Sequence, residues 1–241
     1  MSRPADYDPA EPTAALCDVP IQDNGEPMVD VLEMSDRIFL DRPRFDYKRE
    51  SLLRRSAAER LATAADRLPA GYAFGLVEGW RPPFIQARMF RASWRMLAER
   101  YPELGPEELR PVVERYTAPM EETVPPPHTT GAAFDLALYR DGEPADLNSP
   151  FEWLDPEGFA FDAPGLSDLA RFHRDVLGGA FEGTGITNYA SEYWHWSYGD
   201  QGWAYRGGHP HALYGAVEPP GWKPETRDAI DAPLEFLPDV V

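Results

Sequence analysis

A glutamate and a histidine three positions apart, Glu192 and His195, have the clearest potential for chemistry in this sequence. They lie in the aromatic run 191–199, and aromatic side chains usually bury a large area in a protein core. An ionisable group that is buried without a partner costs free energy, so both residues need one. A metal ion is one such partner, provided that other parts of the chain supply further ligands.

Two further ligands are offered by His128 and Asp135. Alternate residues of a strand share a face, and residues 132–139 have the pattern of a strand. One face of this strand is large and apolar, with Phe134, Leu136 and Leu138. On the other face, Ala133 and Ala137 flank Asp135, so small neighbours leave space in front of the carboxylate. A ligand pocket needs such a space, whereas a purely structural strand does not.

Two histidines and one carboxylate, with an open fourth position for water, are a ligand set of catalytic zinc. We therefore expect His128, Asp135 and His195 to bind one Zn²⁺ ion per chain. Glu192 is then the expected general base, because zinc brings the pKa of a bound water near neutrality and a carboxylate can take the proton. The spacing alone is equally compatible with a structural His128 in a loop and a hydrogen-bonded Asp135.

The spacing of Glu192 and His195 restricts the backbone conformation between them. On a straight strand, residues i and i+3 point to opposite faces. On a helix the two side chains would align, but the aromatic residues around them favour a strand. Glu192 must therefore lie at a bend or bulge just before the strand if both side chains are to reach one metal ion.

Arg81 is the remaining polar candidate, between Trp80 and Pro82 at the end of a predicted strand. A guanidinium group there would bind a substrate carboxylate or the oxyanion of a tetrahedral intermediate. Taken alone, its position favours the simpler interpretation, a surface arginine paired with one of the many acidic residues.

The elements that must position these residues are both helices and strands. Helical spacing of apolar residues predicts helices at 51–68, from the prolines at 82–83 to about residue 100, at 106–116 and at 167–177. Strands are predicted within 29–40 and at 72–80, 132–139, 193–198 and 203–205. No repeating βα unit and no glycine-rich phosphate loop is present. These observations predict an α+β fold with a central antiparallel sheet and helices packed on one side.

The charge and composition exclude several classes of protein. With 23 Lys and Arg against 41 Asp and Glu, the net charge is −18, which repels phosphate backbones and anionic lipid. We therefore expect no nucleic-acid partner. A single cysteine excludes an intrachain disulfide and a cysteine-rich zinc site. The N-terminus lacks the pattern of a secretory signal, and no apolar window approaches the length of a membrane span, so we expect a cytoplasmic protein without a membrane segment.

The organisation along the chain suggests three parts. Residues 1–28 are expected to form an extended acidic and proline-rich arm, residues 29–217 the main domain, and residues 218–241 a proline-rich acidic tail. His209 and His211 offer a second metal site, although a solvated loop is the interpretation that we favour there.

Three motifs, in this order along the chain, resemble those of the D-alanyl-D-alanine dipeptidases, of which the vancomycin-resistance dipeptidase is the best-known member. They are E-G-W-R-P at 78–82, H-x-x-G-x-A-x-D at 128–135 and E-x-W-H at 192–195. The resemblance extends over residues 29–217. It implies the fold that zinc DD-peptidases share with the Hedgehog signalling domain.

Carried over by these matches, His128, Asp135 and His195 would hold zinc, and Glu192 would be the catalytic base. Arg81 would stabilise the tetrahedral transition state. In that family, an aspartate in a Gly-x-x-Phe-Asp segment binds the free amine of the substrate, and Glu152 takes its place here. The extra methylene group of Glu152 extends its carboxylate further into the site.

A second departure concerns the first metal ligand. The family usually has Ser-x-His there, and that serine contacts the substrate. This chain has Pro126 at the serine position, two residues before His128, and proline has neither a hydroxyl group nor a backbone N–H to offer. The replacement of this serine by Pro126 therefore affects how the C-terminal carboxylate of a dipeptide would be recognised.

The resemblance implies a zinc dipeptidase that hydrolyses D-alanyl-D-alanine or a similar small dipeptide. One alternative is a DD- or LD-carboxypeptidase that acts on longer cell-wall peptides. Another is a non-catalytic metal- or ligand-binding protein on the same scaffold. The presence of Glu192 argues against the last alternative, because a protein that only binds does not need the base.

Overall fold

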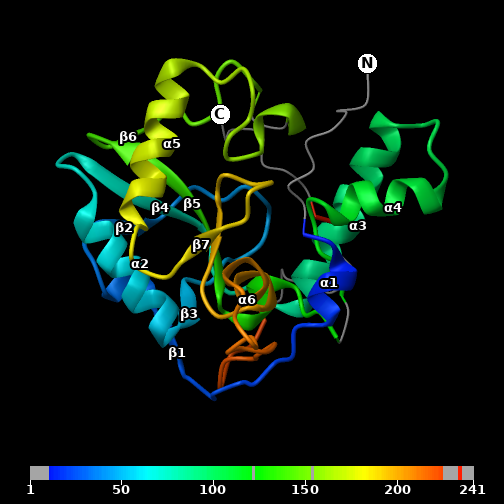
Figure 1. Cartoon of the computed structure of the whole chain (residues 1–241), viewed down its shortest axis with the longest axis horizontal. Coiled ribbons are helices and arrows are strands. Elements are labelled where there is room, and N and C mark those ends of the chain that lie inside the picture. Colours follow the sequence, from blue (N-terminus) through cyan, green and yellow to red (C-terminus); the bar gives the residue numbers. More distant parts are fainter. Residues whose placement is uncertain (1–10, 121–122, 153–154, 225–232, 235–241) are drawn as a thin grey trace.

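The computed structural model describes residues 11–120, 123–152, 155–224 and 233–234. Within these residues, a central sheet has the strand order β2-β4-β5-β8-β7, with β6 paired to β5 (Figure 1). Its strands are β2 (Ile38–Leu40), β4 (Tyr72–Glu78), β5 (Ala133–Arg140), β6 (Glu143–Pro144), β7 (Thr187–Asn188) and β8 (His195–Ser197). A second, small sheet pairs β1 (Met28–Asp30) with β3 (Leu52–Arg54).

Six α-helices and three 3₁₀ turns accompany the strands in the described part of the chain. The helices are α1 (Thr13–Cys17), α2 (Arg55–Arg67), α3 (Pro83–Arg100), α4 (Pro106–Glu114), α5 (Asp168–Ala180) and α6 (Gln201–Gly207). The 3₁₀ turns are η1 (Val31–Glu33), η2 (Pro127–Thr130) and η3 (Pro156–Gly158). None of these helices is both long enough and apolar enough to span a bilayer.

The central sheet is mixed, so the prediction of a wholly antiparallel sheet is wrong. β4 pairs antiparallel with β5, and β5 with β8, whereas β2 pairs parallel with β4. The chain between β2 and β4 contains β3 and α2, and a crossover of this kind brings the second strand in parallel to the first. The α+β class itself is confirmed.

The two faces of the sheet have different roles. One face packs on α2 and α5 in the main core, which includes Leu61, Leu177, Phe74, Phe134, Leu136 and Leu138. The large apolar face predicted for 132–139 is therefore the core face. The other face borders a cavity, and α3 and α4 line its far wall. The expectation of helices on one side of the sheet thus holds for α2 and α5 but not for α3 and α4.

Two predicted elements are corrected by the structure. The helix expected from residue 51 begins at Arg55, because residues 52–54 pair with β1 and bury Leu53 completely. The strand expected at 203–205 is part of α6. The side chain of Asp200 caps this helix by accepting a hydrogen bond from Trp203 N at 2.6 Å, which favours the helix over the strand preferred by aromatic residues.

The described part of the N-terminal segment is tied to the main domain through Arg54. This side chain is 3% exposed, and its guanidinium donates to the carbonyl oxygens of Thr130 at 2.9 Å and Glu26 at 2.8 Å. It also pairs with the Asp23 carboxylate at 2.8 Å. Residues 1–10 of the expected arm and most of the expected tail lie outside the described residues. The three-part division of the chain stays a prediction.

We expect Arg54→Met to lower the free energy of unfolding by about 2–4 kcal/mol, because buried carbonyl oxygens would lose their donors. Urea unfolding followed by tryptophan fluorescence measures the change. Arg140→Met is the control, since Arg140 is exposed and pairs loosely with Asp141 at 3.7 Å. We expect that control to change the stability by less than about 1 kcal/mol. Equal effects of the two substitutions would contradict the role given to Arg54.

Candidate active site

The antiparallel pairing of β5 and β8 brings two of the expected ligands together. Asp135 and His195 occupy directly opposed positions in the register of these strands, so their side chains lie on the same face of the sheet. His128 lies in η2, which ends at Gly131 with φ = 71°. Glycine adopts this left-handed conformation without steric cost, and the chain can turn from η2 directly into β5.

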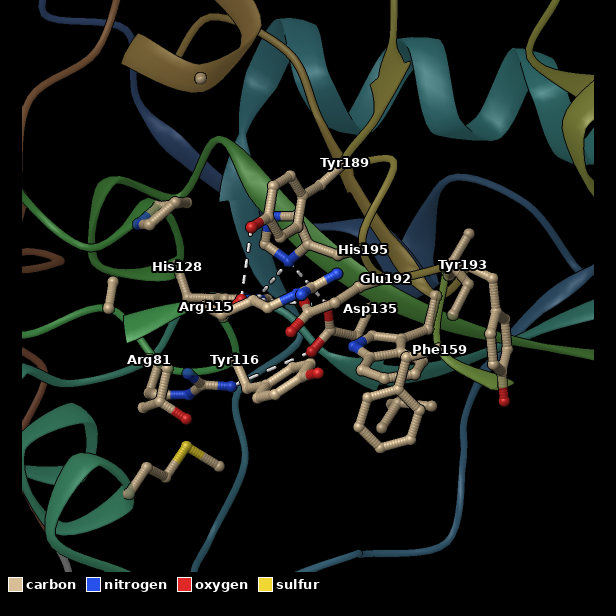
Figure 2. Close-up of a pocket in the computed structure, with 18 of the residues that line it drawn as sticks. Arg81, Arg115, Tyr116, His128, Asp135, Phe159, Tyr189, Glu192, Tyr193 and His195 are labelled. Atoms are coloured by element: carbon tan, nitrogen blue, oxygen red, sulfur yellow. Dashed lines mark hydrogen bonds and ion pairs between the residues drawn. The ribbon is translucent and has the colours of Figure 1, made fainter. Parts of the chain in front are cut away.

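The three side chains form a compact cluster at the base of the cavity (Figure 2). His195 Nδ1 lies 3.0 Å from Asp135 Oδ1, and His128 Nε2 lies 3.3 Å from the same oxygen. The two ring nitrogens are 3.2 Å apart. Ligand atoms bound tetrahedrally at about 2.0–2.1 Å from a zinc ion are about 3.3–3.4 Å from one another. The donor triangle therefore has the size that such an ion requires.

The second nitrogen of His128 fixes which atom faces the cluster. Its Nδ1 lies 3.0 Å from the carbonyl oxygen of Gly79. A carbonyl oxygen only accepts, so Nδ1 carries the proton and Nε2 directs its lone pair toward Asp135 and His195. An outer hydrogen bond of this kind orients a metal-binding histidine.

The protonation states in the cluster also suit a metal ion. Burial by itself would raise the pKa of Asp135, but His128 and His195 hold it well below its ordinary value. Burial lowers the pKa of His195, although hydrogen bonding to Asp135 opposes the change. An ionised carboxylate beside a neutral imidazole is the state in which both residues bind metals.

Glu192 lies at a bend just before β8, as the sequence required. Its backbone N–H donates to Tyr189 O at 2.9 Å, and its own carbonyl oxygen accepts from His195 N at 3.1 Å. These two consecutive turns bring the buried Glu192 side chain to the same cavity as His195. Burial and the negative charge of Asp135 raise the pKa of Glu192 well above its ordinary value, while Arg81 opposes them. A raised pKa suits a group that must accept and return a proton near neutral pH.

Arg81 is buried at the site, so the interpretation as a surface arginine is wrong. Its Nη1 donates to Gln86 Oε1 at 2.7 Å, and its Nη2 lies 3.4 Å from Glu78 Oε2. The same Nη2 is 4.0 Å from Asp135 Oδ2. The backbone N–H of Arg81 donates to His128 O at 3.1 Å, which ties this segment to η2. The charged group is therefore held at a fixed place beside the cluster.

Two other sets of residues singled out in the sequence do not lie at the site. Glu152 is exposed and does not line the cavity, so its role in binding an amine stays a prediction. His209 stacks on Trp203 with ring centroids 3.9 Å apart. Within the described residues, the cluster at His128 is the one group of three potential ligands, and neither His209 nor His211 belongs to such a group.

The cavity has a volume of about 440 Å³, which is within the usual range for a small-molecule site. Its far wall consists of α3 and α4, which pack together around Leu97, Leu109 and Val113 in a cluster separate from the main core. An aromatic series closes the wall: Tyr116, just after α4, contacts Phe159, and Phe159 contacts Trp194. Sequence reasoning did not identify Arg115, Tyr116 or Tyr189 as lining residues, because none of them lies in a recognisable motif.

Comparison with known sequences gives the class of protein, a peptidase, to which this fold and site belong. The chain belongs to the D-ala-D-ala dipeptidase family, peptidase family M15, whose sequence model matches residues 36–212. It is also 29% identical over 237 residues to a D-alanyl-D-alanine dipeptidase of Synechocystis sp. (strain ATCC 27184 / PCC 6803 / Kazusa), covering 83% of this chain and 95% of that protein. The resemblance seen in the three motifs is confirmed.

Proposed function

We propose that this protein is a zinc-dependent dipeptidase that hydrolyses D-alanyl-D-alanine or a closely similar dipeptide. One observation carries the proposal: three donor atoms 3.0–3.3 Å apart lie in one cavity with a buried carboxylate and a buried guanidinium. Family membership supports hydrolysis of a dipeptide.

His128, Asp135 and His195 would hold the metal ion. Two imidazole nitrogens and a carboxylate oxygen suit zinc better than the harder cations, which prefer oxygen ligands. When bound there, zinc would polarise the scissile carbonyl group and make a water molecule more acidic.

Glu192 moves the proton in this proposal. Its carboxylate takes a proton from the attacking water and passes it to the amine that leaves. The same group must therefore be a base in one step and an acid in the next, which a carboxylate of raised pKa does well. The bend at 189–195 holds it beside the cluster without making it part of the ligand triangle.

Arg81 stabilises the negative oxygen that develops on the attacked carbon. Burial by itself would lower the pKa of Arg81, but the carboxylate of Glu78 raises it above its ordinary value, so the side chain stays a cation. Its bonds to Gln86 and Glu78 fix its orientation before the substrate arrives. Such preorganised donors act mainly on the transition state.

Arg81→Met is expected to lower kcat by about 10²–10³ with a much smaller change in KM, because one oxyanion donor is lost. Arg81→Lys should recover part of the rate, since it restores the charge but not the planar fork. Steady-state kinetics with metal content measured in parallel provides the test. An unchanged kcat in the zinc-loaded methionine variant would rule out this role.

The proposed function is tested by the release of D-alanine from D-alanyl-D-alanine by the purified, zinc-loaded protein. Dipeptides of L,D and L,L configuration define the stereochemical preference. A failure to cleave any dipeptide in the presence of zinc would overturn the proposal.

A second function is favoured by one observation. Glu152, the residue expected to hold the free amine of a dipeptide, does not line the cavity. If Glu152 does not bind the free amine, none of the residues assigned above restricts the substrate to two residues. A DD- or LD-carboxypeptidase acting on longer cell-wall peptides is therefore the alternative, and cleavage of such peptides in preference to free dipeptides would establish it.

A further inference from the structure

We propose that Tyr47 is a positioning residue for Arg81: its hydroxyl group engages the carboxylate of Glu78 and so leaves the Arg81 guanidinium able to donate to the oxyanion. This inference rests on the proposed function, because Arg81 has its role in that reaction. Tyr47 lies in the segment between β2 and β3, outside all three sequence motifs.

The carboxylate of Glu78 lies between the side chains of Tyr47 and Arg81. Glu78 is 3% exposed and is the last residue of β4. Its Oε2 accepts a hydrogen bond from the Tyr47 hydroxyl and lies 3.4 Å from Arg81 Nη2. Its Oε1 is buried without a hydrogen-bond partner in the described part of the chain. Tyr47 and Arg81 therefore compete for one oxygen of a buried charge.

The contact between Arg81 and Glu78 is longer than a closed ion pair. A hydrogen bond from a cationic N–H to a carboxylate is usually about 2.7–2.9 Å long. Nη2 of Arg81 lies 3.4 Å from Glu78 Oε2 and 4.0 Å from Asp135 Oδ2, whereas Nη1 makes a 2.7 Å hydrogen bond to Gln86 Oε1. Nη2 thus lies between two carboxylates without closing on either, and it is the nitrogen that can donate to an oxyanion beside the cluster.

The hydroxyl group of Tyr47 is a donor at neutral pH. Burial and the negative charge of Glu78 raise the pKa of Tyr47 well above its ordinary value, while Arg81 opposes them. The phenol therefore keeps its proton. Without this hydroxyl the buried carboxylate would lose a donor, which is costly, and Arg81 would close on Glu78 in its place. That movement would draw the guanidinium away from Asp135 and the substrate.

The ring of Tyr47 is fixed by the helix that follows Arg81. Tyr47 is 5% exposed and belongs to a buried apolar cluster with Ile85, Met89 and Leu234. Ile85 and Met89 are residues of α3, and Gln86 of the same helix binds the guanidinium of Arg81. One rigid element therefore sets the position of the Tyr47 ring relative to the cation.

The test is a double-mutant cycle of Tyr47→Phe and Arg81→Met, measured on zinc-loaded protein with D-alanyl-D-alanine. Phenylalanine keeps the ring and removes the hydroxyl group alone. In the parent background, Tyr47→Phe should lower kcat by about 10- to 100-fold and change KM by less than about twofold, because an oxyanion donor is displaced. In the Arg81→Met background, the same substitution should change kcat by less than about twofold. A purely structural role would lower kcat alike in both backgrounds.

Tyr214→Phe is the matched control. Tyr214 is 1% exposed, and its hydroxyl group donates to the carboxylate oxygen Oε2 of Glu26 at 2.8 Å. It is not among the described residues that line the cavity. This variant also takes a buried hydroxyl away from a carboxylate, and it should leave kcat unchanged whatever its effect on stability. An equal loss of kcat in Tyr47→Phe and Tyr214→Phe would overturn the role given to Tyr47.

Glu78→Gln provides a second comparison if Tyr47→Phe alone does not fold. Removing both the donor and the charge leaves no unpaired buried carboxylate, so the double variant Tyr47→Phe, Glu78→Gln should fold. A neutral amide does not draw the guanidinium, so this double variant should have the kcat of Glu78→Gln within about twofold. A further loss of about tenfold on adding Tyr47→Phe would show that Tyr47 does not act through Glu78 and would contradict the inference.

The outcomes separate this inference from the proposed function. If the parent cleaves dipeptides and Tyr47→Phe keeps the parent kcat, the role of Tyr47 is wrong while dipeptide hydrolysis stands. The same conclusion follows if Tyr47→Phe costs as much in the Arg81→Met background as in the parent. If the zinc-loaded parent cleaves no dipeptide, the proposed function fails and the inference fails with it.

Discussion

Glu192→Gln is expected to reduce kcat for D-alanyl-D-alanine by about 10²–10⁴ without loss of zinc, because an amide has the shape of the carboxylate but does not take up the proton. The carboxylate lies in a buried position beside Asp135, and both features raise its pKa. The glutamine should therefore fit without strain. The rate, the zinc content and the dissociation constant for the dipeptide are measured together.

Glu192→Gln should also affect stability. Although it lowers the rate, it should not lower the free energy of unfolding of the metal-free protein at alkaline pH. A carboxyl group whose pKa is raised by folding stabilises the folded protein below its unfolded pKa, and this contribution is lost as the pH rises through the folded pKa. At pH 8 the metal-free Glu192→Gln protein should consequently be at least as stable as the metal-free parent. Glu114→Gln, another acidic residue of the cavity, is the control and should leave kcat unchanged. A Glu192→Gln enzyme of normal rate would exclude Glu192 as the base.

Removal of zinc by a chelator is expected to abolish hydrolysis and to lower the melting temperature. A ligand that binds only the folded protein stabilises it by about 4 kcal/mol when its free concentration is 1,000 times its Kd. For a chain of this size, we expect a loss of about 8–16 °C on removing it. Both activity and melting temperature should return when zinc is added back.

Asp135→Asn tests whether the metal ion removed by the chelator is bound at the cluster of His128, Asp135 and His195. Its neutral amide is a weak ligand, so the variant should contain little zinc and should melt at the same temperature with or without chelator. The low pKa of Asp135 means that the parent presents an ionised ligand at every pH near neutrality. Full activity in a chelated, metal-free sample of the parent would contradict the metal-dependent mechanism.

Part of the site follows from local sequence patterns. Alternation along 132–139 placed Asp135 opposite the apolar core face, and the i, i+3 spacing of Glu192 and His195 required the bend that the structure contains. The pairing of Asp135 with His195 is different in kind. It depends on the register between strands 60 residues apart, which no local pattern specifies.

The wrong predictions of secondary structure also result from interactions beyond the local pattern. Leu52 and Leu53 fit the helical period of the residues after them, but pairing with β1 overrides that preference. Trp203 favours a strand by propensity, yet the cap at Asp200 starts a helix. Arg115 was not identified as a lining residue because its place on the cavity depends on how α4 packs against α3, and no sequence motif specifies that packing.

The separate core of α3 and α4 has a consequence for how such an enzyme can change. The sheet and η2 carry the cluster of His128, Asp135 and His195, whereas the helical pair around Leu97, Leu109 and Val113 carries the far wall of the cavity. Substitutions that reshape this wall need not disturb the main core around Phe134 and Leu136. The shape of this wall can therefore be altered by substitution without touching the residues proposed to carry out the reaction.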